Sequence, residues 1–179
     1  MKKIILISLM VLAIVLVSCT TTITTRMVNQ PVPNSIDTKQ FLDAVTFVLV
    51  NNGFDIKMMN ESFGLVNTDW RPVKSKSDTA ANVLSALSAG FSGGLMTNYS
   101  RVMMIQVQLN DTGYTLTPKL RRQARTSSIY GTSTDENVNY PDADSAEGQL
   151  AIRIVQEING LLNLPNSYHW EEKVIEISL

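Results

Sequence analysis

Cysteine and histidine, two residue types that often carry chemistry, each occur once in this chain, as Cys19 and His169. One cysteine cannot form an intrachain disulfide, and one Cys with one His cannot supply the four ligands of a structural zinc site. A hydrolase would need His169 to meet a serine and an aspartate through the fold alone, and no spacing in the sequence suggests such a triad. We therefore expect a protein that is not an enzyme.

Acidic residues gather ahead of the second predicted helix, where they could bind Ca²⁺. They are Asp135, Glu136, Asp142, Asp144 and Glu147. The cluster lacks the alternating ligand positions and central glycine of a calcium-binding loop, so a solvated loop and favourable charge at a helix N-terminus explain it better. We expect no metal and no cofactor.

The N-terminus has the pattern of an export signal. The basic segment Met1–Lys3 precedes an apolar run, Ile4–Val17, which is shorter than the roughly 20 residues of a membrane-spanning helix. The residues Leu16-Val17-Ser18-Cys19 resemble the lipobox of bacterial lipoproteins. This resemblance implies that residues 1–18 are a signal peptide that is removed, and that Cys19 carries a diacylglyceryl thioether and an acylated N-terminus, with chains such as palmitate.

Acyl chains on Cys19 would anchor the mature protein to a membrane without a transmembrane helix. In the enterobacterial pattern that the sequence resembles, retention in the inner membrane depends on Asp after the lipidated cysteine, and this chain has Thr20 there. We therefore expect an outer-membrane lipoprotein whose domain faces the periplasm. The alternative is an exported protein that is cut elsewhere and keeps Cys19 as a buried free thiol.

Length and composition indicate one ordinary globular domain. The chain has 179 residues, of which 44% are hydrophobic and 17% charged, with a net charge of −1. Removal of Lys2 and Lys3 with the signal makes the mature chain more acidic, which argues against nucleic acid as a partner. We divide the chain into the signal peptide (1–18), a tether (19–36) that could include a short strand, and a single domain (37–179).

Hydrophobic periodicity predicts two helices and a run of strands. The first helix begins at Asp37 or Thr38 and ends at Asn51, and the second begins at Asp144 or Ser145 and ends before Pro165. Alternating patterns predict strands near residues 54–58, 63–70, 99–109 and 114–122, and the tail could add one at 174–177. The order is (β)αββββα, an α+β fold in which a four-stranded antiparallel meander packs against two helices.

The residues Gly53-Phe54-Asp55-Ile56, followed by Gly64-Leu65-Val66-Asn67-Thr68-Asp69-Trp70, carry a family resemblance. They are similar to the Gly-aromatic-x-hydrophobic and Gly-hydrophobic-Val-x-Thr-x-Trp pattern of helix-grip domains in the C lipoprotein of the outer-membrane β-barrel assembly machinery, and Arg101 fits that pattern. The similarity covers about residues 37–163. It implies a helix-grip-like fold, lipid anchoring and an envelope location, and no catalytic residues.

Antiparallel threading brings basic residues to one end of the meander. They are Arg71, Lys74, Lys76, Arg101, Lys119, Arg121, Arg122 and Arg125. Such a patch could contact an anionic lipid headgroup, a glycan or an acidic partner. The favoured alternative is internal pairing with the acidic loop from Asp135 to Glu147.

The segment 77–98 contains Val83, Leu84, Leu87 and Phe91 at helical spacing, ahead of glycines that loosen it. We predict either a short helix over the end of the sheet or an apolar lip for a partner or membrane.

The sequence therefore favours a noncatalytic binding or scaffolding module of the envelope, with an envelope protein as its partner, in outer-membrane assembly or maintenance. One alternative is a carrier that holds a small apolar molecule in a cavity lined by Val45, Leu49, Ile105 and Val107. The less favoured alternative is the hydrolase built on His169.

Overall fold

The computed structural model describes residues 20–32, 36–73, 83–84, 86, 97–126, 133–135 and 138–178. The predicted signal peptide and Cys19 lie outside these residues, as do Lys74, Lys76, Leu87 and Phe91. The chain forms two compact units, a larger one of residues 26–171 and a smaller one that contains residues up to 25 and from 172 onward. The larger unit carries the core and the candidate functional site.

Both predicted helices are present, and each begins at a predicted capping residue. In α2 (Thr38–Asn51) the Asp37 carboxylate accepts a hydrogen bond from the Gln40 amide at 2.9 Å. In α4 (Ala146–Leu162) the Ser145 hydroxyl accepts one from the Gly148 amide at 3.0 Å. These side chains satisfy amides that the first helical turn leaves without partners.

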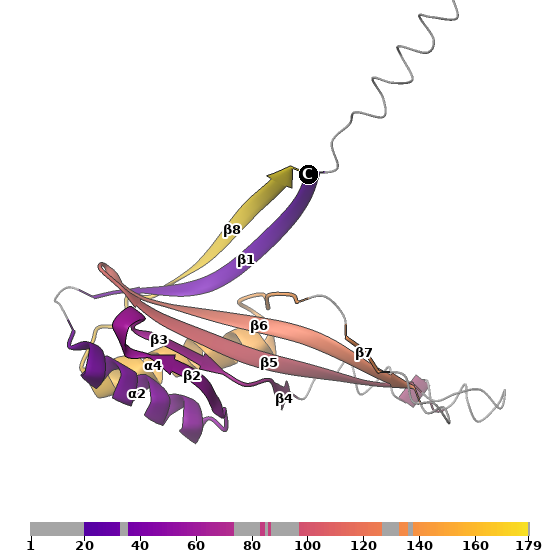
Figure 1. The fold of residues 1–179 in the computed structure, drawn as a ribbon, viewed down its shortest axis with the longest axis horizontal. Coiled ribbons are helices and arrows are strands. Elements are labelled where there is room, and N and C mark those ends of the chain that lie inside the picture. The colour runs from indigo at the N-terminus through magenta and orange to yellow at the C-terminus, as the bar shows by residue number, and fades with distance from the viewer. Residues whose placement is uncertain are drawn as a thin grey trace, which may run out of the picture. The chain divides into compact units, whose positions relative to one another are not determined.

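The strands form one sheet in the order β2-β3-β5-β6-β1-β8, with β4 paired to β5 and β7 paired to β6 (Figure 1). Their bounds are β1 (Thr20–Pro31), β2 (Ile56–Asn60), β3 (Leu65–Thr68), β4 (Arg71–Val73), β5 (Thr97–Asn110), β6 (Gly113–Thr126), β7 (Ser133–Asp135) and β8 (His169–Ser178). The ladders from β2 to β6, and that between β6 and β1, are antiparallel. The fold is thus α+β, as predicted.

The predicted count of four core strands is wrong, because the described residues form eight strands. The predicted strand 63–70 is shorter than expected: Phe63 belongs to the 3₁₀ helix η1 (Glu61–Phe63), and only Leu65–Thr68 forms β3. A separate strand, β4, follows the predicted one, and β3 and β4 pair with successive stretches of β5. The positive φ of 55° at Gly64 makes the turn between η1 and β3. The strand β7 was not predicted, because its three residues, Ser-Thr-Asp, show no alternation of apolar and polar side chains.

Residues 26–31 belong to the folded unit rather than to a tether. Val28 lies opposite Leu116 of β6, and its side chain is fully buried. The same register would bring Arg26 opposite Pro118, which has no N–H to donate to a neighbouring strand. Pro118 therefore gives a reason for the β1–β6 ladder to end short of Arg26.

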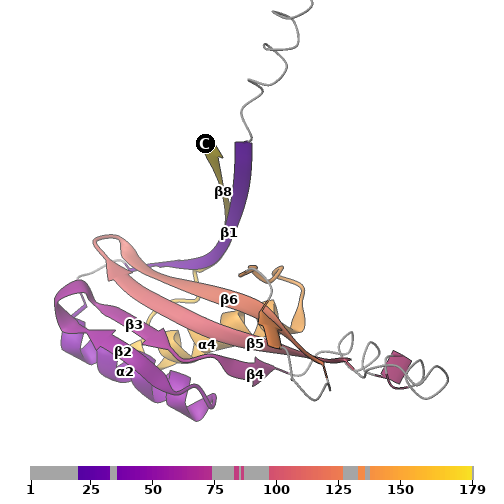
Figure 2. The same ribbon diagram turned by 45° about the vertical axis from the view of Figure 1, so that its right-hand side comes forward.

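The two helices cover the same face of the sheet (Figures 1 and 2). One continuous core joins side chains of α2, α4 and the central strands, among them Phe41, Ile154 and Leu116. The four side chains proposed to line a ligand cavity, Val45, Leu49, Ile105 and Val107, lie in this core with no exposed surface.

A bulge in β2 breaks the predicted alternation of Phe54, Ile56 and Met58. The pairing of β2 with β3 shifts register between Ile56 and Met58, so Lys57 is the extra residue. Phe54 is buried, but Met58 is 44% exposed and Met59 is 48% exposed. The bulge thus leaves two large apolar side chains in succession at the surface.

Candidate functional site

Four of the predicted basic residues meet at one end of the sheet. Arg101 lies directly opposite Arg122 and also opposite Val73, and Arg71 lies opposite Met103. We call Arg71, Arg101, Arg121 and Arg122 the arginine end. Arg125 lies opposite Asn98 in the same ladder, and its side chain is outside what the structure describes.

Side chains of the molecule itself contact the arginine end. Arg101 forms an ion pair with Glu147, with its Nη1 3.6 Å from Oε1, and the Glu147 side chain is only 7% exposed. The guanidinium of Arg121 lies 4.2 Å from the centre of the Trp70 ring, and that of Arg71 lies 4.9 Å from the centre of the Phe54 ring. These cation–π contacts and the ion pair favour internal pairing as the role of this basic cluster. Lys119, on the same strand as Arg121, donates to Gln106 at 3.1 Å.

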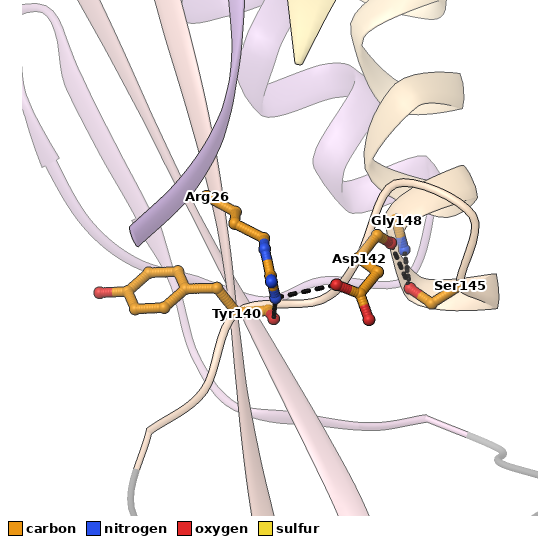
Figure 3. A network of polar contacts seen from close by, with 5 residues as sticks. All are labelled: Arg26, Tyr140, Asp142, Ser145 and Gly148. Atoms are coloured by element: carbon orange, nitrogen blue, oxygen red, sulfur yellow. Dashed lines mark hydrogen bonds and ion pairs between the residues drawn. The ribbon is translucent and has the colours of Figure 1, made fainter. Parts of the chain in front are cut away.

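A pocket of about 310 Å³ lies between the arginine end and the start of α4. Its lining includes Arg101, Arg121, Arg122, Asn139, Asp142, Ser145 and Glu147. Figure 3 shows the contacts of Arg26 with the pocket segment that contains Tyr140 and Asp142. Arg26 donates to the Tyr140 carbonyl at 3.1 Å and forms an ion pair with Asp142 at 2.9 Å. Both acidic residues of the lining are thus in ion pairs with arginines.

Among the predicted acidic residues, Asp142 pairs with Arg26 and Glu147 with Arg101. Asp135 lies in β7, Asp144 is exposed ahead of α4, and Glu136 is outside the described residues. Within the described ranges, no group of three His, Cys, Asp or Glu side chains is close enough together to hold a metal ion. Helix N-terminal charge accounts for Glu147, in the first turn of α4.

His169 is exposed at the start of β8, beside a pocket whose other lining residues include Asn29, Gln30 and Tyr114. Among the described residues that line this pocket there is neither a serine nor a carboxylate.

A buried polar network lies between β1, β6 and α4. The Tyr114 hydroxyl donates to Asn159 Oδ1 at 2.7 Å, and Asn159 Nδ2 donates to Gln30 Oε1 at 2.8 Å and to Asn166 Oδ1 at 3.0 Å. Gln30 Nε2 in turn donates to the Pro165 carbonyl at 3.0 Å. Burial raises the pKa of Tyr114 well above its usual range, so the phenol stays protonated as a donor.

Two residues of the predicted lip lie in the described part of the chain. Val83 and Leu84 are helical, and they are 53% and 67% exposed. Leu87 and Phe91 are outside that part, so the choice between a helix over the sheet end and a lip stays open.

Sequence reasoning missed an apolar surface beside the first edge strand. Phe47 and Val50 of α2 are 58% and 53% exposed, and with Met59 of β2 they line a shallow pocket of about 360 Å³. Thr46 Oγ1 lies 3.9 Å from Met59 Sδ, which places the methionine against the helix. We call Phe47, Val50 and Met59 the α2–β2 edge.

A signal for the α2–β2 edge was present in the sequence. The buried stripe of α2 is Phe41, Leu42, Val45, Val48 and Leu49. Phe47 and Val50 lie three residues apart and form a second stripe beside it. An amphipathic helix that packs on one face alone would carry polar residues there.

Searches against models of known protein families and against curated proteins find no match to this chain. No helix within the described residues has the length and apolar character needed to cross a membrane.

Proposed function

We propose that this protein is a lipid-anchored, noncatalytic binding module of the bacterial outer membrane that holds another envelope protein through the α2–β2 edge. The exposure of three large apolar side chains, Phe47, Val50 and Met59, around one shallow pocket at the margin of a well-packed domain carries the proposal. Contiguous apolar surface of this kind is characteristic of protein-binding sites.

The arrangement of elements supports a helix-grip-like fold and, through it, a role in outer-membrane assembly or maintenance. In the sheet, the strands β2, β3, β5 and β6 lie side by side in the order in which they occur along the chain, with β4 off this path, α2 before them and α4 after them. That succession agrees with the one implied by the resemblance of Gly53–Ile56 and Gly64–Trp70 to such domains.

Packing favours a binding module over a carrier of an apolar ligand. A carrier needs space between the helices and the sheet, and Val45, Leu49, Ile105 and Val107 fill that region with fully buried side chains.

Site-specific photo-crosslinking in living cells tests the binding role. A photoreactive phenylalanine analogue at Phe47 should give a crosslinked protein adduct. The matched control is the same analogue at Leu161, an exposed apolar position on α4 that is 48% exposed. Equal adducts at both positions, or none at Phe47, would contradict the proposal.

Cell fractionation tests the anchor separately. Cys19→Ala removes the only thiol that could be lipidated. The variant should lose its palmitate label and the mobility shift of the processed protein. Full membrane retention with unchanged processing would exclude the lipoprotein assignment.

A further inference from the structure

The described residues of the smaller unit are the ends of two strands. Residues 20–25 are the first half of β1, and residues 172–178 are the larger part of β8. Residues 20–25 are all β-branched, with five threonines and one isoleucine, and β8 adds Val174, Ile175 and Ile177. Such side chains favour extended backbone. The part of the predicted tether next to the predicted lipid anchor is therefore a strand.

The end of β8 lies beside the start of β1, as both views show (Figures 1 and 2). The two strands are neighbours in the sheet, and with these ends together they run antiparallel. Asn29 of β1 donates to Glu171 of β8, which shows where the strands lie level. From there β1 extends back nine positions to Thr20, and β8 extends on seven positions to Ser178. The end of β8 therefore comes within about two positions of Thr20, or about 7 Å along the strands.

The pairing in the smaller unit is that of a two-stranded ribbon. The strand β6 pairs with β1 only at residues 28–31, so among the described residues β8 is the one strand partner of residues 20–25. A two-stranded ribbon by itself is only marginally stable in water. Contact with a further surface would therefore stabilise it.

We propose that the end of β8 contacts the lipid surface beside Cys19, so that the protein meets the membrane through a second chain segment as well as through its acyl chains. This inference rests on the lipid anchor of the proposed function. Cys19 directly precedes Thr20, and an acylated cysteine lies at the bilayer surface. Pairing with β1 then brings residues 174–178 to the same surface, where Val174, with its side chain 54% exposed, contacts lipid.

Fluorescence quenching in vesicles tests this contact. Cys19 is the only cysteine and acylation consumes its thiol, so Ser178→Cys gives the lipidated full chain a single thiol for a bimane fluorophore. The labelled protein is reconstituted into phosphatidylcholine vesicles in which some headgroups carry a nitroxide. The fluorophore should lose most of the intensity that it has in vesicles without nitroxide. Unchanged intensity would overturn the proposal.

Prolines in β8 give the matched control. Val174→Pro and Ile175→Pro together remove two successive backbone donors, and one of these faces β1, because successive N–H groups point to opposite sides of a strand. The bimane at Ser178→Cys should then keep most of its intensity. Urea unfolding of the larger unit should not change, since both prolines lie outside it. Equal quenching with and without the prolines would show that pairing with β1 does not hold β8 at the membrane, and it would overturn the proposal.

A palmitate label on Cys19 separates this inference from the lipid anchor itself. A labelled chain with a quenched fluorophore supports both. A labelled chain with an unquenched fluorophore leaves the anchor standing and overturns the membrane contact of β8, whereas the absence of the label contradicts both.

Discussion

The polar network around Asn159 and the α2–β2 edge reverse the usual distribution of side chains. Asn159, Gln30 and Tyr114 are polar and almost fully buried, whereas Phe47 and Met59 are apolar and about half exposed. The difference lies in where each group finds a partner. The network is satisfied within the domain, where it joins β1, β6 and α4, while the edge has apolar surface that the domain leaves uncovered.

This contrast separates residues that hold the fold from residues available for binding. Buried polar groups are tolerated when hydrogen-bonded, and removal of one partner leaves the others desolvated without compensation. Exposed apolar side chains contribute little to folding, so their loss should affect association and leave the domain intact.

Asn159→Leu should have the largest effect on stability, because it removes the central member of the network, leaves Gln30 Oε1 without its donor and takes from the Tyr114 hydroxyl its shorter-range acceptor. We expect a loss of about 3 kcal/mol in the free energy of unfolding, measured by urea denaturation. Asn166→Ala, at the exposed margin of the network, is the control and should cost less than about 1 kcal/mol. Equal losses in the two variants would mean that the network does not hold the fold.

Tyr114→Phe should cost about 1.5 kcal/mol at neutral pH, since it leaves Asn159 Oδ1 without its donor. Burial raises the pKa of Tyr114, so above about pH 10 the unfolded chain releases this proton while the folded chain keeps it. The stabilising contribution is therefore complete below pH 10 and falls as the pH rises further. Unfolding at pH 9 and pH 11 should show a steeper decline for the natural protein than for Tyr114→Phe, and parallel declines would contradict the role of burial.

Glu147→Gln tests whether the arginine end is balanced within the molecule. Loss of the carboxylate opposite Arg101 should cost about 1 kcal/mol, because Glu147 is buried but Arg101 is partly exposed. The control is Arg153→Gln, which removes an exposed pair with Glu157 and should change stability by less than about 0.5 kcal/mol. If Glu147→Gln is as stable as the natural protein at low salt, Glu147 does not balance Arg101. The arginine end would then again be a candidate anion-binding site.

Phe47→Ser should have the smallest effect on folding, within about 0.5 kcal/mol, because the side chain is 58% exposed. The same change should abolish most crosslinking from a photoreactive phenylalanine analogue placed instead at Val50, which lines the same pocket. Leu161→Ser is the control for a general loss of surface hydrophobicity and should leave crosslinking intact. A strongly destabilised Phe47→Ser protein would place Phe47 with the residues that hold the fold.

The helices were predictable because their signals are local. Asp37 and Ser145 cap the two helices within three residues of the amides they bind, and the apolar stripe of α2 follows from spacing alone. The long hairpin of β5 and β6 was predictable for a similar reason, since regular alternation flanks the tight turn before Gly113.

Features that depend on distant partners were not predictable. Val28 becomes a core residue only because β1 pairs with Leu116, far along the chain, and Lys57 bulges only because β2 must match β3. The strand pattern predicted that the arginine end would form at one end of the sheet. It could not predict the contacts made there, which are Glu147 with Arg101, Trp70 with Arg121 and Phe54 with Arg71. Those assignments require the helix, the loop and the sheet in three dimensions.

Hydrogen exchange tests the contrast between the satisfied interior and the uncovered edge most directly. The lipidated chain in envelope membranes should be compared with the same chain purified and diluted in detergent. We predict that amides of residues 56–60 and 46–51 exchange more slowly in the membrane sample, where the partner covers the α2–β2 edge, while residues 154–159 exchange equally in both. Equal exchange at residues 56–60 in the two samples would contradict the assignment of the α2–β2 edge as the binding surface.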